Sequence, residues 1–230
     1  MQRTDTVSRD RKSLFSAAAK RGIDFITAAV LLSALLPFLT LVAVLIKLDS
    51  CGPVFFRQER IGANGRPFTV WKFRTMVQGA ISKGAGIFVT QDDPRITRLG
   101  KWLRALSIDE LPQLINVLCG EMSLVGPRPT LRYQVEQYDA FQWQRLKALP
   151  GITGLAQVSG RNTLSWPERI KLDVWYVCNR RLALDFRILM RTVSVLASGA
   201  GTYNEDRSKF EVGKRPGADA GRIEPHRLSS

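Results

Sequence analysis

The stretch FITAAVLLSALLPFLTLVAVLI, residues 25–46, holds 22 consecutive residues without a charge. A buried helix of a soluble protein seldom contains more than about 10–14 such residues in a row. A cleaved signal peptide has a shorter apolar region that ends at small residues, and no such cleavage site follows this run. The stretch therefore predicts a helix that enters a membrane.

Pro37 lies inside this run, with 12 uncharged residues before it and 9 after it. A straight helix of this length would measure about 33 Å, just enough to cross a bilayer. Proline removes one backbone hydrogen bond and predicts a kink, and the two arms, about 18 and 14 Å long, would each reach mid-bilayer and return. We expect the hydroxyl of Ser33 to support the freed backbone. On these grounds a spanning helix and a re-entrant helix both stay open.

Basic residues flank the run on both sides, with six before it and 28, against 17 acidic residues, after it. Because positively charged flanks stay in the cytoplasm, neither end is expected to cross. The net charge of +14 predicts an anionic partner, which can be nucleic acid, anionic lipid or a phosphorylated substrate. Three cysteines give no disulfide framework and fit a reducing cytoplasm.

Downstream of the run, residues 53–58 and 67–73 predict two strands, and the Asn64-Gly65 pair between them favours a hairpin. Residues 92–107, DDPRITRLGKWLRALS, predict an amphipathic basic helix. Its cationic stripe would be a solvated face or a surface against lipid or phosphate. The stripe consists of Arg95, Arg98, Lys101 and Arg104.

Further helices are predicted over residues 130–148, 165–177 and 182–197, and a short one after residue 110. The expected fold class is α+β and mainly helical, with one β-hairpin. We divide the chain into a basic N-terminal segment (1–21), the membrane helix (22–48), a cytoplasmic domain (49–198) and a mobile C-terminal tail (199–230).

The residues available for chemistry are mostly carboxylates and cations. The only histidine, His226, lies in the predicted tail, and the cysteines lack metal-ligand spacing. The adjacent pair Asp109-Glu110 follows the basic helix. Ser107-x-x-Glu110 fits a capping box, which is the ordinary use of such a pattern. Alternatively, a helix that begins near Pro112 leaves the pair in the turn before it.

In either arrangement the helix dipole and Arg104 would favour ionised carboxylates. An ionised aspartate beside a metal-binding glutamate can attack a phosphoryl group, and Mg²⁺ needs only one or two carboxylates. Arg128 lies between two prolines, which makes its position rigid. Lys72, Arg74 and Arg161 extend the set of cations. Together they predict a diphosphate substrate that meets a lipid phosphate at the membrane face.

Six segments of the chain occur in the order typical of a known family. They are KRGIDF, GPVFFRQERIG, FTVWKFRTM, RITRLGKWLRALSIDELPQLINVLCGEMSLVGPRP, LPGITGLAQVSGRN and LDVWYV. With them, residues 18–198 resemble the bacterial sugar transferases, the monotopic phosphoglycosyl transferases that initiate polysaccharide assembly. The resemblance is to the minimal catalytic form, and among these to the enzymes that start exopolysaccharide synthesis.

The resemblance implies transfer of a hexose 1-phosphate, with galactose or glucose favoured, from a UDP-sugar to undecaprenyl phosphate, with release of UMP. It implies Asp109 as the nucleophile that carries the phosphosugar and Glu110 as the Mg²⁺ ligand. Lys72, Arg104 and Arg128 are implied as phosphate contacts, and Arg161 and Asp173 as further substrate-binding residues. Asp173 and Asp185, by pattern alone, would form salt bridges on helix surfaces.

The resemblance also implies a re-entrant membrane helix and a place on the cytoplasmic face of the bacterial inner membrane, among its lipids. Two positions depart from the family pattern. Leu36 precedes Pro37 where a serine is frequent, and Cys51 stands where a proline is common. A homodimer stays open.

The rival hypothesis is a membrane-tethered basic module that binds nucleic acid or anionic lipid without catalysis. The sequence lacks the interleaved aromatic residues of single-strand binders and any DNA-reading motif, so we expect no nucleic acid partner. A catalytically inactive scaffold for polysaccharide assembly is disfavoured by the intact Asp109-Glu110 pair.

Overall fold

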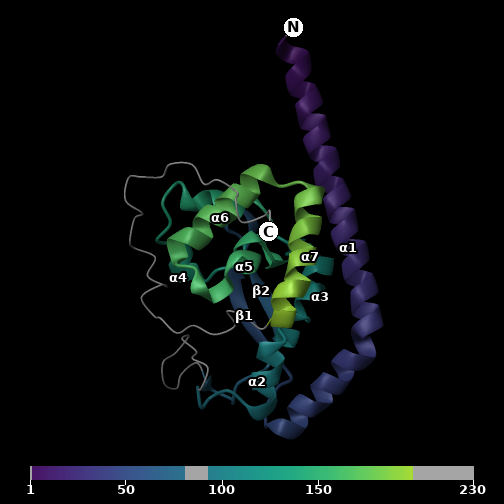
Figure 1. Ribbon diagram of the computed structural model, residues 1–230, viewed down its shortest axis with the longest axis vertical. Helices are drawn as coiled ribbons and strands as arrows, with labels where there is room; N and C mark the ends of the chain where they lie inside the picture. Colours follow the sequence, from purple (N-terminus) through teal and green to yellow (C-terminus); the bar gives the residue numbers. More distant parts are fainter. Residues whose placement is uncertain (1, 81–92, 199–230) are drawn as a thin grey trace.

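A single long helix, α1 (Gln2–Asp49), dominates the computed structural model, which describes residues 2–80 and 93–198. Figure 1 shows α1 running past the other elements and then bending sharply, so that its last part turns toward α2. Pro37 lies within this helix, and a bend is the expected effect of a proline. The hydroxyl that bonds the backbone there is that of Thr40, which donates to the Leu36 carbonyl at 2.9 Å, and not that of Ser33.

The apolar part of α1 remains largely uncovered. Within the described residues, Ala17–Asp49 is the one helical stretch long and apolar enough to cross a membrane. Large apolar side chains on both sides of the bend face outward, including Ile26 (64% exposed) and Leu48 (78% exposed). Such a surface is stable only against lipid or another apolar partner.

Two cores hold the arms of α1 against the rest of the chain. In the first arm, Ala28 is buried with Val117, Leu184 and Ile188. The second arm packs against the hairpin and the basic helix, in a cluster of Leu39, Val42, Ile46, Phe73 and Leu103. The apolar part of α1 is therefore packed against the rest of the chain by both of its arms and is not a tether on a linker.

The predicted hairpin is confirmed. Strands β1 (Phe55–Ile61) and β2 (Pro67–Phe73) pair antiparallel, with a register that runs from Phe55 opposite Phe73 to Ile61 opposite Pro67. Asn64 at φ 55° and Gly65 at φ 76° form the turn in a short 3-10 segment, η1 (Ala63–Gly65). The first strand begins two residues later and ends three residues later than predicted.

The basic helix exists as α2 (Arg98–Ala105), capped by the Thr97 hydroxyl, which accepts from the Gly100 amide at 3.0 Å. Gly100 touches the backbone of Thr75 so closely that a Cβ would lie 2.1 Å from its carbonyl oxygen. The predicted four-residue stripe is wrong at one end. Arg95 precedes the helix, where it is buried in an ion pair with Asp93 at 2.6 Å.

The chain then forms a 3-10 turn, η3 (Ile108–Glu110), α3 (Gln113–Cys119) and strand β3 (Ser123–Val125), which pairs parallel with β4 (Gly151–Thr153). The predicted helix over 130–148 is wrong. Only α4 (Arg132–Val135) and the 3-10 segment η4 (Gln142–Lys147) form there. The Asp139 carboxylate accepts from the Gln142 amide at 2.8 Å and so starts a new turn between them.

The last elements are α5 (Leu155–Ser159), η5 (Arg161–Thr163), α6 (Trp166–Asn179) and α7 (Leu182–Ser198). The predicted helices 165–177 and 182–197 correspond to α6 and α7 and are confirmed. The mainly helical α+β class with a hairpin is confirmed as well. The predicted mobile tail, 199–230, lies outside the described residues, as does most of the glycine-rich stretch 79–86.

Candidate active site

The carboxylate pair lies in the turn η3, between the basic helix α2 and the apolar helix α3. Ser107, which precedes the turn, has φ 56° and makes no capping hydrogen bond. Pro112 directly precedes α3, which begins at Gln113. The capping-box interpretation is therefore wrong. The alternative is confirmed in that the pair lies in a turn before the helix, although the helix begins one residue after the proline.

Glu110 is held by two cations from other segments. Lys72 from β2 donates to Oε1 at 2.7 Å, and Arg128 donates to the same oxygen at 2.7 Å and to Oε2 at 3.3 Å. Burial by itself would raise the pKa of Glu110, but Arg128 and Lys72 outweigh it and keep this pKa far below its ordinary range. Glu110 is therefore ionised at any physiological pH.

Asp109 has the opposite environment. Among the described residues no side chain or backbone group forms a hydrogen bond or ion pair with its carboxylate. Burial raises the pKa of Asp109 to about 6, assisted by the negative charge of Glu110 and opposed by the charge of Lys72. Arg104 acts on the pKa of Asp109 in the expected direction, but burial outweighs it, because a desolvated and unbonded carboxylate ionises less readily. With a pKa of about 6, Asp109 is still mostly ionised at pH 7, as expected from the sequence.

Two further predicted cations border the turn. The Nε of Arg104 donates to the Thr75 hydroxyl at 2.8 Å, and its charge acts on Asp109. Arg161 donates to the Ser107 hydroxyl at 3.1 Å. Arg161 (φ 49°) and Ser107 are both in the left-handed region, which non-glycine residues rarely adopt. Strained backbone of this kind tends to concentrate at functional sites.

Arg60 belongs to the same group of cations and was not predicted. It shares a small recess with Lys72, Arg128 and Gln113. Burial, together with the charge of Arg128, lowers the pKa of Arg60 to about 10. A sequence signal did exist, because Arg60 and Lys72 occupy positions of the paired strands that share one face.

Asp173 does not join this group. It is 2% exposed and forms an ion pair with Arg145, which also donates to the Tyr138 hydroxyl at 2.6 Å. Asp185 is also buried, where it accepts from Lys20 at 2.6 Å and from the Tyr176 hydroxyl at 2.6 Å. The prediction of surface salt bridges is wrong for both, because α6 and α7 turn these carboxylates into the core.

A basic and an acidic residue just before the apolar part of α1 attach this helix to the elements that follow the turn. Arg21 donates to the carbonyls of Val117 and Leu118 at the end of α3, at 2.6 and 2.9 Å. Asp24 accepts from the Ser123 hydroxyl at 2.7 Å. At the other end, Arg74 has a structural role, since it is buried and donates to the carbonyls of Ser50 and Cys51, directly after α1, at 2.7 and 2.8 Å. Asp24 was not singled out in the sequence.

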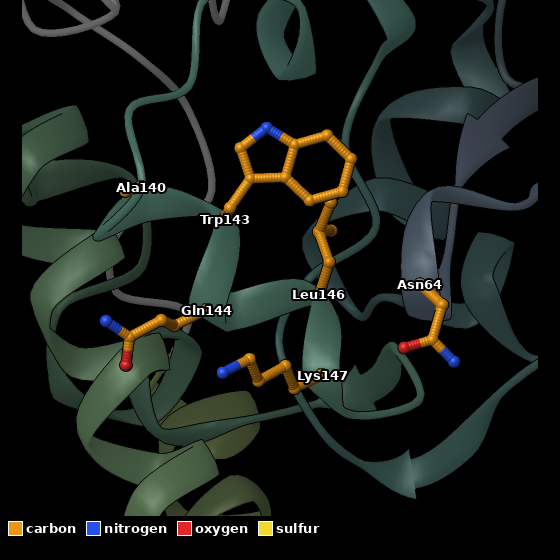
Figure 2. Close-up of a pocket in the computed structure, with 6 residues that line it drawn as sticks. All are labelled: Asn64, Ala140, Trp143, Gln144, Leu146 and Lys147. Atoms are coloured by element: carbon orange, nitrogen blue, oxygen red, sulfur yellow. The ribbon is translucent and has the colours of Figure 1, made fainter.

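A larger hollow, about 420 Å³ in volume, lies elsewhere, between the hairpin turn and η4. Figure 2 shows that its polar side chains do not converge, since the amide of Asn64 and the ammonium group of Lys147 point in different directions. None of the cations around Glu110 lines it. The carboxylate turn, and not this hollow, is the candidate site.

The donor chemistry of the turn fits Mg²⁺, which prefers carboxylate oxygens and usually completes its shell with water and substrate phosphates. Within residues 2–80 and 93–198, no three His, Cys, Asp or Glu side chains gather into an all-protein metal cage. Glu110, the predicted ligand, would supply one of the one or two carboxylates that a magnesium ion shared with substrate phosphates requires.

Residues 15–199 match the family described as bacterial sugar transferase, and the chain belongs to that family. The exopolysaccharide production protein ExoY of Sinorhizobium fredii is 40% identical over 199 residues, which are 80% of this chain and 88% of the relative. The undecaprenyl-phosphate glucose phosphotransferase of Komagataeibacter xylinus is 46% identical over 189 residues, or 76% of this chain and 35% of the relative.

The UDP-galactose-lipid carrier transferase of Erwinia amylovora is 39% identical over 211 residues, which are 86% of this chain and 44% of the relative. The chain thus corresponds to nearly all of ExoY and to less than half of the other two relatives. The family recognised from the six sequence segments is confirmed.

Proposed function

We propose that this protein transfers a hexose 1-phosphate from a UDP-sugar to undecaprenyl phosphate, as the first membrane step of exopolysaccharide synthesis. The names of the three relatives support this assignment, since they refer to exopolysaccharide production, undecaprenyl phosphate and UDP-galactose. The observation that carries it is the difference between the two adjacent carboxylates. Glu110 accepts hydrogen bonds from two cations, whereas the carboxylate of Asp109 has no hydrogen-bond or ion-pair partner in the described part of the chain.

A carboxylate without hydrogen-bond donors retains its lone pairs for attack. In the proposed first step an oxygen of Asp109 forms a bond to the β-phosphorus of the UDP-sugar, and the bond from that phosphorus to the bridging oxygen breaks. UMP leaves with that oxygen and its electron pair. An oxygen of undecaprenyl phosphate then attacks the same phosphorus, which releases the Asp109 carboxylate and forms the sugar diphosphate lipid.

Cations around the turn fit the charge of these substrates. Lys72 and Arg128 reach Glu110 from two different segments, and Arg104 and Arg161 border the same turn. A diphosphate that enters would compete with Glu110 for Lys72 and Arg128, and this exchange would release oxygens of Glu110 for a metal. Bound there, Mg²⁺ would neutralise phosphate charge in the transition state.

Exposed side chains near the turn support a position at the membrane surface. Trp102 (72% exposed) and Leu106 (54% exposed) project from α2 beside the exposed cations Arg98 and Lys101. Such a face is typical of a helix that lies in the headgroup region. Because the second arm of α1 packs against α2, we propose that α1 is re-entrant and that the turn η3 lies at the cytoplasmic membrane surface.

The test combines turnover with a mass measurement. Protein in detergent with Mg²⁺, undecaprenyl phosphate and a panel of UDP-sugars should release UMP with UDP-galactose or UDP-glucose. Without the lipid, a stoichiometric amount of UMP should appear, and the intact protein should gain the mass of a hexose phosphate. The adduct should be absent from Asp109→Asn.

Glu110→Gln is the second variant of this test, and it should weaken the dependence of turnover on Mg²⁺. Turnover without any adduct in the wild type would contradict the covalent step. Absence of UMP with every donor would contradict the function itself.

A further inference from the structure

The loop that carries Arg128 is held at four consecutive peptides by hydrogen bonds from other segments. Pro127 and Pro129 lack amide hydrogens, so the loop must be held mainly through its carbonyl oxygens. Each of four consecutive carbonyls, from Pro127 to Thr130, accepts a hydrogen bond from another segment. The donors are Gly151 N at 2.9 Å, Arg145 Nη2 at 3.1 Å, Arg60 Nη1 at 3.5 Å and Ile61 N at 2.8 Å.

Arg145 differs from the other donors because it is a fully buried charge. It is 3% exposed, and one guanidinium nitrogen contacts both Asp173 and the carbonyl of Arg128. The other terminal nitrogen donates to Tyr138, and the rings of Tyr138 and Trp166 lie 5.8 and 5.6 Å from the guanidinium carbon. The guanidinium group is therefore fixed in its plane as well as in its position.

This arrangement is costly if its only purpose is stability. A buried ion pair is often no better than two apolar side chains of the same volume. A charged donor does, however, bind a carbonyl more strongly than a neutral one does. The carbonyl in question belongs to the residue whose side chain contacts Glu110, so a displacement of this peptide displaces the Arg128 guanidinium.

We propose that Arg145, oriented by Asp173, is a positioning residue that holds the peptide of Arg128 so that its guanidinium meets Glu110. The proposal rests on the proposed function for its kinetic consequence. It assigns Asp173 an action through Arg145 and Arg128, in place of the substrate contact expected from the sequence.

The first experiment is a mutant cycle with Asp173→Asn, Arg128→Ala and the double variant. Asp173→Asn should lower kcat for UMP release about 10- to 100-fold, the range typical of groups that orient a reactive residue. In the Arg128→Ala background the same change should have almost no further effect. Asp185→Asn is the matched control, because Asp185 is a similarly buried carboxylate bonded to a lysine and a tyrosine. Its effect should be the same in both backgrounds.

A second variant separates positioning from folding. In Arg145→Met/Asp173→Leu the buried charges are removed together, so the melting temperature should stay near that of the wild type. Its kcat should nevertheless remain as low as that of Asp173→Asn. Wild-type turnover by this folded double variant would overturn the proposal, as would an equal effect of Asp173→Asn with and without Arg128.

Hydrogen exchange gives a readout that does not depend on turnover. In Asp173→Asn the amides of residues 123–131 should exchange faster than in the wild type, whereas Asp185→Asn should leave Arg128 and Thr130 unchanged. Unaltered exchange in Asp173→Asn would overturn the proposal. If the wild type releases no UMP, the proposed function fails, and the exchange data still decide whether Arg145 holds the loop.

Discussion

Two clusters in this protein each contain one lysine and two carboxylates. In the anchor cluster, Lys20 lies 2.6 Å from Asp185 and 3.7 Å from Asp24. In the site cluster, Lys72 contacts Glu110 and acts by its charge on Asp109. The anchor cluster joins α1 to β3 and α7, and the site cluster lies in the turn between α2 and α3.

The two clusters differ in whether every carboxylate has hydrogen-bond or ion-pair partners. Both acids of the anchor accept additional hydrogen bonds, Asp24 from Ser123 and Asp185 from Tyr176. In the site cluster, Glu110 likewise accepts from two cations, Lys72 and Arg128, but Asp109 has no hydrogen-bond or ion-pair partner within the residues described. Buried carboxylates with hydrogen-bond and ion-pair partners stabilise a fold, whereas one without such partners keeps its reactivity at the expense of stability.

The largest expected effect comes from Asp109→Asn, which removes the carboxylate that has no hydrogen-bond or ion-pair partner. UMP release should fall by more than about 1,000-fold, because an amide is not a nucleophile of comparable strength. Folding should be unharmed. The folded state raises the pKa of Asp109 from 3.8 to about 6, so ionisation at neutral pH weakens the fold. Turnover and thermal melting at pH 7 check both points, and a lower melting temperature would contradict the comparison.

Lys20→Met tests the anchor cluster, where the expected loss is in stability. Removal of the cation leaves Asp24 and Asp185 with uncompensated charge, which should cost about 3 kcal/mol of unfolding free energy. Folded molecules should keep most of their turnover. Lys47→Met, an exposed change near the end of the same helix, is the control and should melt like the wild type. Loss of turnover without loss of stability would place Lys20 in the chemistry.

The pH dependence should report Asp109 and not Glu110. Below pH about 6, Asp109 becomes protonated and loses its nucleophilicity, so kcat/KM should fall about tenfold per pH unit as the pH decreases. The pKa of Glu110 is lowered by Arg128 and Lys72, so Glu110 stays ionised throughout this range. A profile that is flat down to pH 4.5 would contradict the raised pKa of Asp109.

The smallest effect is expected at the hollow beside the hairpin turn. Trp143→Ala should change UMP release by less than about twofold, because Trp143 is 44% exposed and the hollow shares no residue with the carboxylate turn. Lys72→Met, assayed in parallel, should lose about 10- to 100-fold. A large loss in Trp143→Ala with unchanged melting would assign the hollow a part in substrate binding.

Much of this molecule follows from local sequence. The uncharged run with its proline, the Asn64-Gly65 hairpin and the helices α6 and α7 are dictated by periodicity and turn chemistry, which depend on neighbours in the chain. The helix predicted over residues 130–148 failed where one side chain, that of Asp139, bonds the backbone and interrupts an otherwise helical pattern. The adjacent acids Asp109 and Glu110 were found because their position between a basic and an apolar helix is a sequence feature.

Tertiary structure alone set the burial, partners and charge state of those residues. Sequence cannot assign opposite pKa shifts to neighbouring carboxylates. The pKa of Asp109 is raised by burial, and that of Glu110 is lowered by Arg128 and Lys72, which are 18 and 38 residues away from it. Sequence likewise placed Asp173 and Asp185 on a surface, because helical periodicity does not reveal a buried charge whose partner comes from another element. Charge state and burial depend on distances through space, and the fold sets these distances only when segments remote in the chain pack together.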